Sequence, residues 1–376
     1  MLRRSSLTLL VSVLTLLAAQ SAAAADRAGP AGLVFAQTNE PSGNQIVVFD
    51  RDANGGLSRA GAFATGGSGS AAVPGTESDH LGSQGSLAYD PAHHLLIAVN
   101  AGSNSVSALR VVGDRLQLLG VVPSGGDFPA SVAIHGDLVY VLNSGSAGVV
   151  QGFRVSDSGL TPIAGSGRSL GLTNSNPPFF LESPGQVGFS PDGSKLIVTT
   201  KKSGSTIDVF AVGADGLLSS TPSVDPSATP VPFAFTFAPS GRLVVGEAGT
   251  SSLTTYRLQP DGTLAEPKSL SDGQTALCWV QQVGDYYYVS NTGSNTISAF
   301  TIGADGRPAL VGGSDVATTT DAGPIDETSP PGSHLLYVET GTAGTIEAFA
   351  VNADGSLTRL QDVTGLPPGL EGIASS

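Results

Sequence analysis

A few ionisable side chains stand at places in this sequence where acid–base chemistry is possible. Glu247 ends the run "RLVVGE", where three comparable apolar runs end in Asn. Asp326 lies in "GPIDET", at the start of an expected strand, and His80 lies in a long polar loop. Carboxyl and imidazole groups serve as general acids and bases. We therefore predict Glu247, Asp326 and His80 as catalytic candidates, with plain solvent exposure as the alternative for His80.

Three further residues are candidates for binding a substrate. Lys201 and Lys202 are two of the four lysines in the chain, and they occupy a loop whose counterparts elsewhere are neutral. Ammonium groups can hold an anion or steady a developing oxyanion. Gln186, which ends the long loop before the same unit, is the third candidate. The alternative for the two lysines is a solvated turn.

Metal and thiol chemistry receive less support from the sequence. Asn100, Asn143 and Asn291 could offer oxygen ligands to calcium, but their recurrence at equivalent places favours a role in turn geometry. The one cysteine, Cys278, lies in the apolar run "TALCWV", which is typical of a buried, inert thiol. No cofactor is expected, and a calcium ion with Glu247 as a ligand stays open as a third-ranked alternative.

These residues lie in a sequence that repeats one phrase. The segment "DYYYVSNTGSNTISAF" from Asp285 reads as two strands joined by a tight turn. Comparable hairpins begin at six other places: Leu33, Leu95, Leu138, Lys195, Arg242 and Leu335. An apolar strand precedes most of these hairpins, and a turn such as "GADG" with a fourth strand follows. Each unit is therefore expected to be a four-stranded antiparallel sheet.

Seven such sheets predict an all-β, seven-bladed β-propeller, because a single sheet cannot bury both of its faces. The first unit begins at its second strand, "GLVFAQT", and lacks an inner strand. The C-terminal segment "GLEGIASS" can supply it, which would close the ring and remove two open sheet edges. The alternative is a frayed tail.

The longest loops all fall on one face of the predicted ring. They comprise residues 66–85, 166–186 and 223–234, whereas the turns of the other face are short and uniform. Irregular loops on a rigid scaffold commonly carry binding sites. We therefore expect any site to lie at the mouth of the central channel on the face with the long loops.

The N-terminal segment indicates the location of the protein, and the net charge indicates which binding partners are disfavoured. Arg3 and Arg4 precede an apolar run and the small residues Ala23, Ala24 and Ala25, which is the order of a secretory leader. We predict a signal peptide at residues 1–25, one propeller domain at residues 26–376, and a secreted or periplasmic protein; the general secretory and twin-arginine routes both stay open. The apolar run is too short for a membrane span. The net charge of −14 disfavours binding to nucleic acid.

The repeated phrase, with "LLIAVNAGSNSVSAL" and "VGFSPDGSKLIVTT", resembles the Tyr-Val-Thr-Asn propeller repeat. The whole unit is similar to the lactonase-family seven-bladed propellers, which include 6-phosphogluconolactonase-type and carboxymuconate-lactonising enzymes. That family often carries His and Arg where inner strands start. Here Ser183 and Gly185 stand at such places in one unit, and Phe233 and Ala234 in the next. No catalytic residue of the family is therefore transferred.

The sequence supports two functions almost equally. The resemblance implies an exported lactonase-like hydrolase, which opens a lactone or related cyclic ester at the channel mouth. The missing His and Arg favour a non-catalytic propeller that presents its loop face to a protein, glycan or cell-envelope partner. A monomer is expected in either case, and whether the protein is an enzyme stays open at this point.

Overall fold

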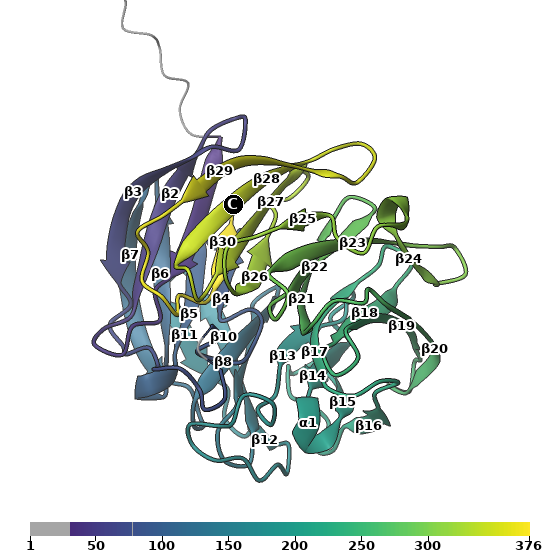
Figure 1. Ribbon diagram of the computed structural model, residues 1–376. Coiled ribbons are helices and arrows are strands. Elements are labelled where there is room, and N and C mark those ends of the chain that lie inside the picture. The colour runs from purple at the N-terminus through teal and green to yellow at the C-terminus, as the bar shows by residue number, and fades with distance from the viewer. Residues whose placement is uncertain (1–30, 77) are drawn as a thin grey trace, which may run out of the picture.

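The computed structural model describes residues 31–76 and 78–376, and these form a seven-bladed β-propeller (Figure 1). The predicted signal peptide lies outside the described residues. Blade 1 consists, from the outer strand inward, of β3 (Leu57–Ala64), β2 (Gln45–Arg51), β1 (Gly32–Gln37) and β30 (Ile373–Ser375). The other blades are given from the inner strand outward. Blade 2 consists of β4 (Leu87–Asp90), β5 (Leu95–Asn100), β6 (Ser105–Val112) and β7 (Arg115–Pro123); blade 3 of β8 (Pro129–His135), β9 (Leu138–Asn143), β10 (Val149–Ser156) and β11 (Gly159–Pro162), with β12 (Arg168–Ser169) beside β10; and blade 4 of β13 (Gln186–Phe189), β14 (Lys195–Thr199), β15 (Thr206–Ala211) and β16 (Ser223–Pro226).

Blades 5 to 7 repeat the same antiparallel order. They are built from β17 (Pro232–Phe237), β18 (Arg242–Glu247), β19 (Ser252–Leu258) and β20 (Leu264–Ser271); β21 (Leu277–Val283), β22 (Tyr286–Asn291), β23 (Thr296–Ile302) and β24 (Pro308–Leu310), with β25 (Thr318–Thr319) beside β23; and β26 (Pro324–Thr328), β27 (Leu335–Thr340), β28 (Thr345–Val351) and β29 (Leu357–Val363). The helical pieces in the described chain are α1 (Lys201–Gly204) and two short 3₁₀ turns, η1 (Ala101–Ser103) and η2 (Val311–Gly313). None of these pieces has the length and apolar character that a membrane crossing by a helix requires.

The outer turns explain how the chain reverses between the last two strands of a blade. Gly216 and Gly262 follow Asp in these turns and have φ angles of 84° and 96°, a region that side chains disfavour. The preceding carboxylates accept backbone hydrogen bonds inside the turn, from Leu217 to Asp215 and from Thr263 to Asp261, both at 3.0 Å. The repeated Asp-Gly pair therefore fixes the register of these outer strands.

The hydrophobic core is divided into clusters between neighbouring blades. Leu33 and Phe35 of blade 1 pack with Leu96 and Leu109 of blade 2, for example. Six further clusters in the described chain join blades 2 and 3, 3 and 4, 4 and 5, 5 and 6, 6 and 7, and 7 and 1. Each sheet thus buries both faces against its neighbours, which is the reason a single blade cannot stand alone.

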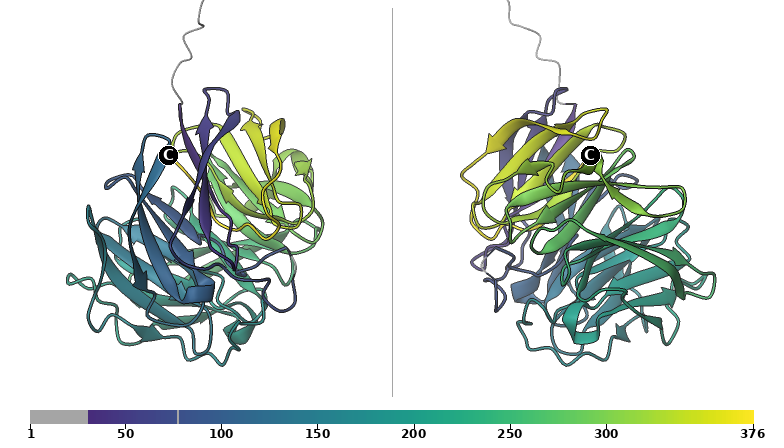
Figure 2. Two further views of the ribbon diagram at one scale, coloured as in Figure 1. Left: turned by 90° about the vertical axis from the view of Figure 1, so that its left-hand side faces the viewer. Right: turned by 45° about the vertical axis from the view of Figure 1, so that its right-hand side comes forward.

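The C-terminal strand closes the ring, as the sequence predicts. β30 pairs antiparallel with β1, with Phe35 opposite Ala374. The backbone N–H of Ser376 donates to the carbonyl oxygen of Leu33 at 3.0 Å, and that of Gln37 donates to Gly372 at 2.8 Å. Figures 1 and 2 show the yellow end of the chain against the purple strands of blade 1. Both termini of the propeller are therefore held in one sheet.

This closure predicts a large loss of stability when β30 is removed. A variant that lacks residues 373–376 exposes the edge of β1 and loses the buried side chains of Ile373 and Ala374. We expect its free energy of unfolding to fall by at least ~3 kcal/mol. Denaturant unfolding measures this difference.

Leu360→Ser is the matched control, because Leu360 is 40% exposed on the outer strand β29. Its effect should stay within about 0.5 kcal/mol. A truncated protein as stable as the intact chain would show that the ring does not depend on its closing strand.

Candidate functional site

The loop between blades 1 and 2 sends a short segment across the axis of the propeller. This plug segment, residues 79–85, bonds to four other blades. Gly82 accepts from Lys201 of blade 4, Gln84 bonds with Val280 of blade 6, and Gly85 donates to Asp326 of blade 7. The Ser83 hydroxyl also donates to the carbonyl oxygen of Ala130, in blade 3, at 2.7 Å. A segment that reaches blades on several sides of a ring must lie at its centre.

Glu371, which precedes the closing strand, holds the plug segment. Its carboxyl oxygens accept the backbone N–H groups of Leu81 at 2.7 Å and Ser83 at 3.3 Å. The indole N–H of Trp279 donates to the carbonyl oxygen of Ser83 at 3.0 Å. The segment that closes the ring therefore also positions the plug.

Asp79 and Glu371 form a buried pair of carboxyl groups. Burial raises the pKa of Asp79, although the charge of Lys201 acts in the opposite direction. Burial, followed by the charge of Asp79, raises the pKa of Glu371 well above its usual value. Two adjacent buried carboxyl groups cannot both ionise cheaply, so one of the two stays protonated. The hydrogen bond between them favours the charged form of Asp79, and Glu371 retains the proton.

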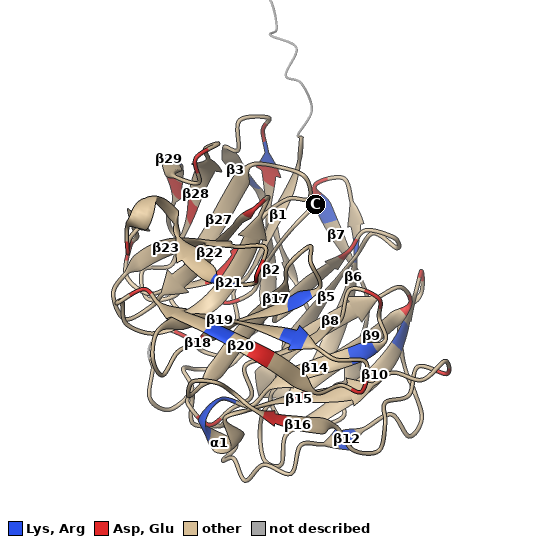
Figure 3. Cartoon of the chain, turned by 90° about the vertical axis from the view of Figure 1, so that its right-hand side faces the viewer, with Lys and Arg blue, Asp and Glu red and all other residues tan. Residues whose placement is uncertain are grey.

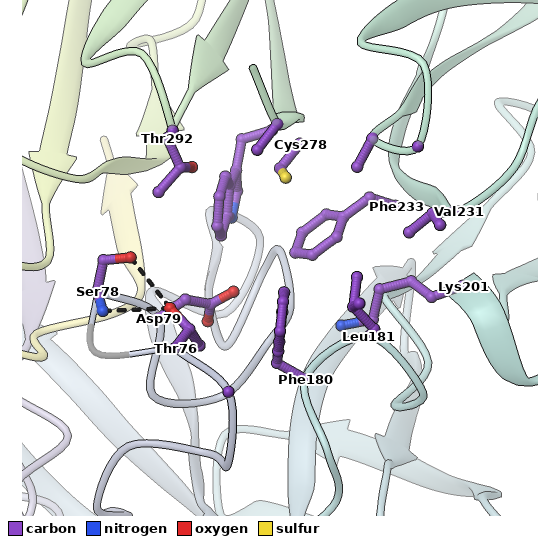
Figure 4. A pocket seen from close by; sticks show the side chains of 16 residues that line it. Thr76, Ser78, Asp79, Phe180, Leu181, Lys201, Val231, Phe233, Cys278 and Thr292 are labelled. Carbon is purple, nitrogen blue, oxygen red and sulfur yellow. Dashed lines mark hydrogen bonds between the residues drawn. The ribbon is translucent and has the colours of Figure 1, made fainter.

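Beside the plug lies a cavity of about 330 Å³. Its walls come from the plug loop, from the loop before blade 4, and from hairpins and connections of blades 4, 5 and 6. Figure 4 shows Asp79, Lys201, Phe180 and Phe233 gathered around this space. The lining includes Thr76, Ser78, Asp79, Phe180, Leu181, Lys201, Val231, Phe233, Cys278, Trp279 and Thr292. Each of the three long loops contributes to these walls, for example through Thr76, Phe180 and Val231.

Lys201 is a buried cation in apolar surroundings. Its side chain is fully buried, and its Nζ donates to the carbonyl oxygen of Gly82 at 2.6 Å. The same Nζ lies 4.6 Å from the ring centroid of Phe233, which is a cation–π distance. Gly82 has a φ of 68°, and a Cβ there would approach the Lys201 Nζ to 3.0 Å, so the close contact requires glycine.

The surroundings change the acidity of Lys201 and Cys278. Burial lowers the pKa of Lys201 to about 8, because the charged form loses its hydration, while Asp79 partly compensates. Within the described chain the ammonium group makes one hydrogen bond, so two of its three N–H donors remain for a ligand. Burial also raises the pKa of Cys278 to about 12, which leaves its thiol protonated and unreactive.

The structure places Glu247 away from this cavity. Its buried carboxylate, at the end of β18, accepts hydrogen bonds from four hydroxyl groups of blade 5 and its preceding loop: Ser227, Thr229, Thr254 and Tyr256. Each of its oxygens is thus occupied by the protein itself. The arrangement fastens residues 227–229 to blade 5 and leaves no oxygen for a substrate.

Asp326 and Gln186 lie outside the cavity, near Gln84 and Gly85 at the end of the plug segment. Asp326 accepts the N–H groups of Gly85 at 3.3 Å and of Glu327 at 3.2 Å. Burial raises the pKa of Asp326 to about 7. The amide oxygen of Gln186 accepts the backbone N–H of Phe235 at 2.6 Å. Both residues line a second, more open recess, and neither lines the cavity beside Lys201.

His80 and Lys202 also lie outside the cavity lining. His80 is half-buried and its Nδ1 is 3.2 Å from the carbonyl oxygen of Ser70. Burial lowers the pKa of His80. Lys202 is exposed on α1, whose two lysines form the blue segment at that label in Figure 3. Of the six candidate residues from the sequence, only Lys201 meets the cavity.

Sequence reasoning missed Asp79 and Glu371. Asp79 neighbours His80 in a loop that the sequence singled out, but nothing in one sequence tells which residue of a long loop turns inward. Glu371 lies in the predicted closing segment, where backbone pairing was expected and its carboxyl group had no assigned partner. Glu371 is the one acid of the predicted closing segment "GLEGIASS", but nothing in the sequence indicates which group its carboxyl would meet.

No group of three or more His, Cys, Asp or Glu side chains suited to a metal ion occurs within residues 31–76 and 78–376. The recurring asparagines have hydrogen-bond partners within the protein. Asn100, for example, donates to Ser105 and Ser107 of its own blade and accepts from Asn44 and Thr65 of the preceding one. The buried carboxyl pair beside the cavity consists of two groups, and its hydrogen bonds go to the plug segment. The calcium alternative stays a prediction.

No protein-family model matches the sequence, and no curated protein sequence is significantly similar to it. Solved structures are similar in fold. The periplasmic gluconolactonase PpgL of Pseudomonas aeruginosa has a TM-score of 0.72 and 18% identity, over 92% of this chain and 98% of that one. A 6-phosphogluconolactonase candidate from Bacteroides uniformis has a TM-score of 0.71 and 19% identity, over 92% and 99%.

A Lactobacillus plantarum protein has a TM-score of 0.72 and 19% identity, over 92% of this chain and 99% of that one. At these identities the likeness shows the fold alone. Because it extends over nearly the whole of each chain, the neighbours and this protein share one complete fold.

Proposed function

We propose that this protein is an exported hydrolase of the lactonase type, which opens a cyclic ester in the cavity beside Lys201. The single observation that carries the proposal is a buried ammonium group, Lys201, and a buried carboxyl group, Asp79, at the wall of one small cavity, with Glu371 paired to Asp79 behind it. Perturbed ionisable groups at a cavity are common at functional sites. The lactonase names of similar folds support the reaction class, and the leader-like N-terminus and the periplasmic neighbour support export.

Lys201 would stabilise the charge that develops on the ester carbonyl oxygen. When water attacks the carbonyl carbon, this oxygen becomes negative, and an ammonium donor in a water-poor site stabilises it strongly. The bond to Gly82 and the contact with Phe233 hold the ammonium group in place before the substrate arrives. Burial removes the hydration of this ammonium group and lowers its pKa to about 8, so an oxyanion would be a favourable partner.

Asp79 would act as the general base. It takes a proton from the attacking water as the new C–O bond forms, and it returns that proton to the ring oxygen as the ester C–O bond breaks. The product is a hydroxy acid, which then ionises. The raised pKa of Asp79 makes it a stronger base than an exposed aspartate, and Glu371 keeps it in position through the hydrogen bond between the two carboxyl groups.

Removal of either charged group should abolish catalysis. Lys201→Met and Asp79→Asn should each lower kcat/KM for a hydrolysed lactone by roughly 100-fold or more, because each removes a group that acts in the transition state. Initial rates of acid release by the pure protein, corrected for spontaneous hydrolysis, measure the effect.

Two matched controls separate catalysis from folding. Lys202→Met removes the exposed neighbour of Lys201, and Asp208→Asn removes a buried carboxyl group of β15 that does not line the cavity. Both should retain the rate of the unmodified protein to within about threefold. Equal rates for Lys201→Met and Lys202→Met would remove the proposed role of Lys201.

The rate should also depend on pH in a specific way. Lys201 must be charged, so kcat/KM should fall as the pH rises through about 8, the pKa that burial gives this group. Lys201→Arg should move this alkaline limb to higher pH, because a guanidinium group stays protonated. The acid limb should lie above the range of an exposed aspartate, since burial raises the pKa of Asp79. An alkaline limb that is identical in Lys201→Arg would contradict the assignment.

A further inference from the structure

We propose, on the basis of the function proposed above, that the substrate is a small lactone with an apolar ring or chain, and not a phosphorylated or hydroxyl-rich sugar lactone. The inference comes from the walls of the cavity, from the polar groups that those walls have already used, and from the charge that they carry. Each of these points is independent of how the ester bond is broken.

The walls of the cavity are aromatic and aliphatic. The rings of Phe233 and Trp279 lie 4.7 Å apart between centroids at an angle of 56°, and Leu181 and Val231 complete this side. Phe180 faces the same space (Figure 4). Flat apolar surfaces of this kind stabilise a hydrocarbon ring or short chain through burial and stacking.

The polar groups at the walls are already paired within the protein. The hydroxyls of Thr76 and Ser78 lie 3.2 Å from each other, and the hydroxyl of Thr292 donates to the carbonyl oxygen of Pro324 at 2.8 Å. The indole N–H of Trp279 is bonded to Ser83. A sugar lactone would bury more hydroxyl groups here than the remaining free donors and acceptors can satisfy, and each unsatisfied group costs free energy.

The charges at the cavity do not suit a phosphate group. Lys201 is the one cation among the described lining residues, and it is already bonded to Gly82 and close to the charge of Asp79. A phosphate monoester carries nearly two negative charges and is usually held by several donors or by arginine. The ester carbonyl oxygen of a neutral lactone needs only one hydrogen-bond donor, and the Lys201 ammonium group can provide it.

The volume sets an upper limit on the substrate. About 330 Å³ lies at the lower end of the range of ligand pockets, which is roughly 300–1,000 Å³. One ring with a fused ring or a short substituent fits this space. A long acyl chain would have to extend out of the cavity mouth.

Two lactones and two unreactive analogues test this inference. Dihydrocoumarin and glucono-1,5-lactone are compared as substrates, and chroman and glucose, which lack the ester, are compared as ligands. We expect kcat/KM for dihydrocoumarin to exceed that for glucono-1,5-lactone by at least about tenfold. Trp279 is the only tryptophan in the chain and lines the cavity, so its fluorescence reports occupancy without any turnover.

A pair of neighbouring phenylalanines supplies matched variants. Phe180 lines the cavity, whereas Phe179, 5.2 Å away between ring centroids, does not. Phe180→Ser should weaken the binding of chroman roughly tenfold, because an apolar contact is lost. Phe179→Ser should change it by less than about threefold.

The outcomes separate this inference from the proposed function. Faster turnover of glucono-1,5-lactone than of dihydrocoumarin, dependent on Lys201, would uphold the lactonase and overturn the apolar substrate class. Binding of chroman that depends on Phe180, with no turnover of either lactone, would uphold the apolar ligand class and overturn the lactonase. A fluorescence response to glucose and none to chroman, or no response to either, would overturn the inference.

Discussion

The contact between the Lys201 ammonium group and the carbonyl oxygen of Gly82 is the interaction on which the candidate site depends. A fully buried cation in an apolar cavity is costly unless polar groups compensate for its lost hydration. Here one carbonyl oxygen, an aromatic face and the nearby charge of Asp79 supply that compensation. The carbonyl oxygen and the carboxylate both belong to residues 79–85. Without this plug segment, most of the compensation for the lost hydration of Lys201 would disappear.

The plug segment depends in turn on the closure of the ring. Glu371 accepts two of its backbone N–H groups, and one residue later the chain begins to pair with β1. The same segment therefore completes blade 1, holds the plug and forms a hydrogen bond with Asp79. This connection explains how Glu371, near the end of the sequence, supports a cavity whose walls come from the plug loop and from blades 4, 5 and 6. It also makes global stability and the geometry of the site inseparable in this fold.

The sequence was sufficient for the architecture because the architecture repeats. Seven copies of one hairpin pattern, each with its own turn residues, indicate the blades, and a missing first strand indicates the closure. The site does not repeat, so no internal comparison identifies it. Glu247 differs from the asparagines at the same place in other blades, which made it a catalytic candidate. Its carboxylate instead accepts hydrogen bonds from four hydroxyl groups of blade 5 and the loop before it. Asp79 and Glu371 become significant only through a contact that spans almost the whole chain, and a single sequence carries no signal for such a contact.

Lys201 is a buried ammonium group whose charge is available to a ligand, and the titration of that group is the decisive experiment. The chain has four lysines, so NMR of protein labelled at the lysine side chains can follow each of them. The account predicts one lysine signal that titrates near pH 8, disappears in Lys201→Met and shifts when chroman occupies the cavity. Four signals that all titrate near the usual pKa of lysine, about 10.4, would contradict it.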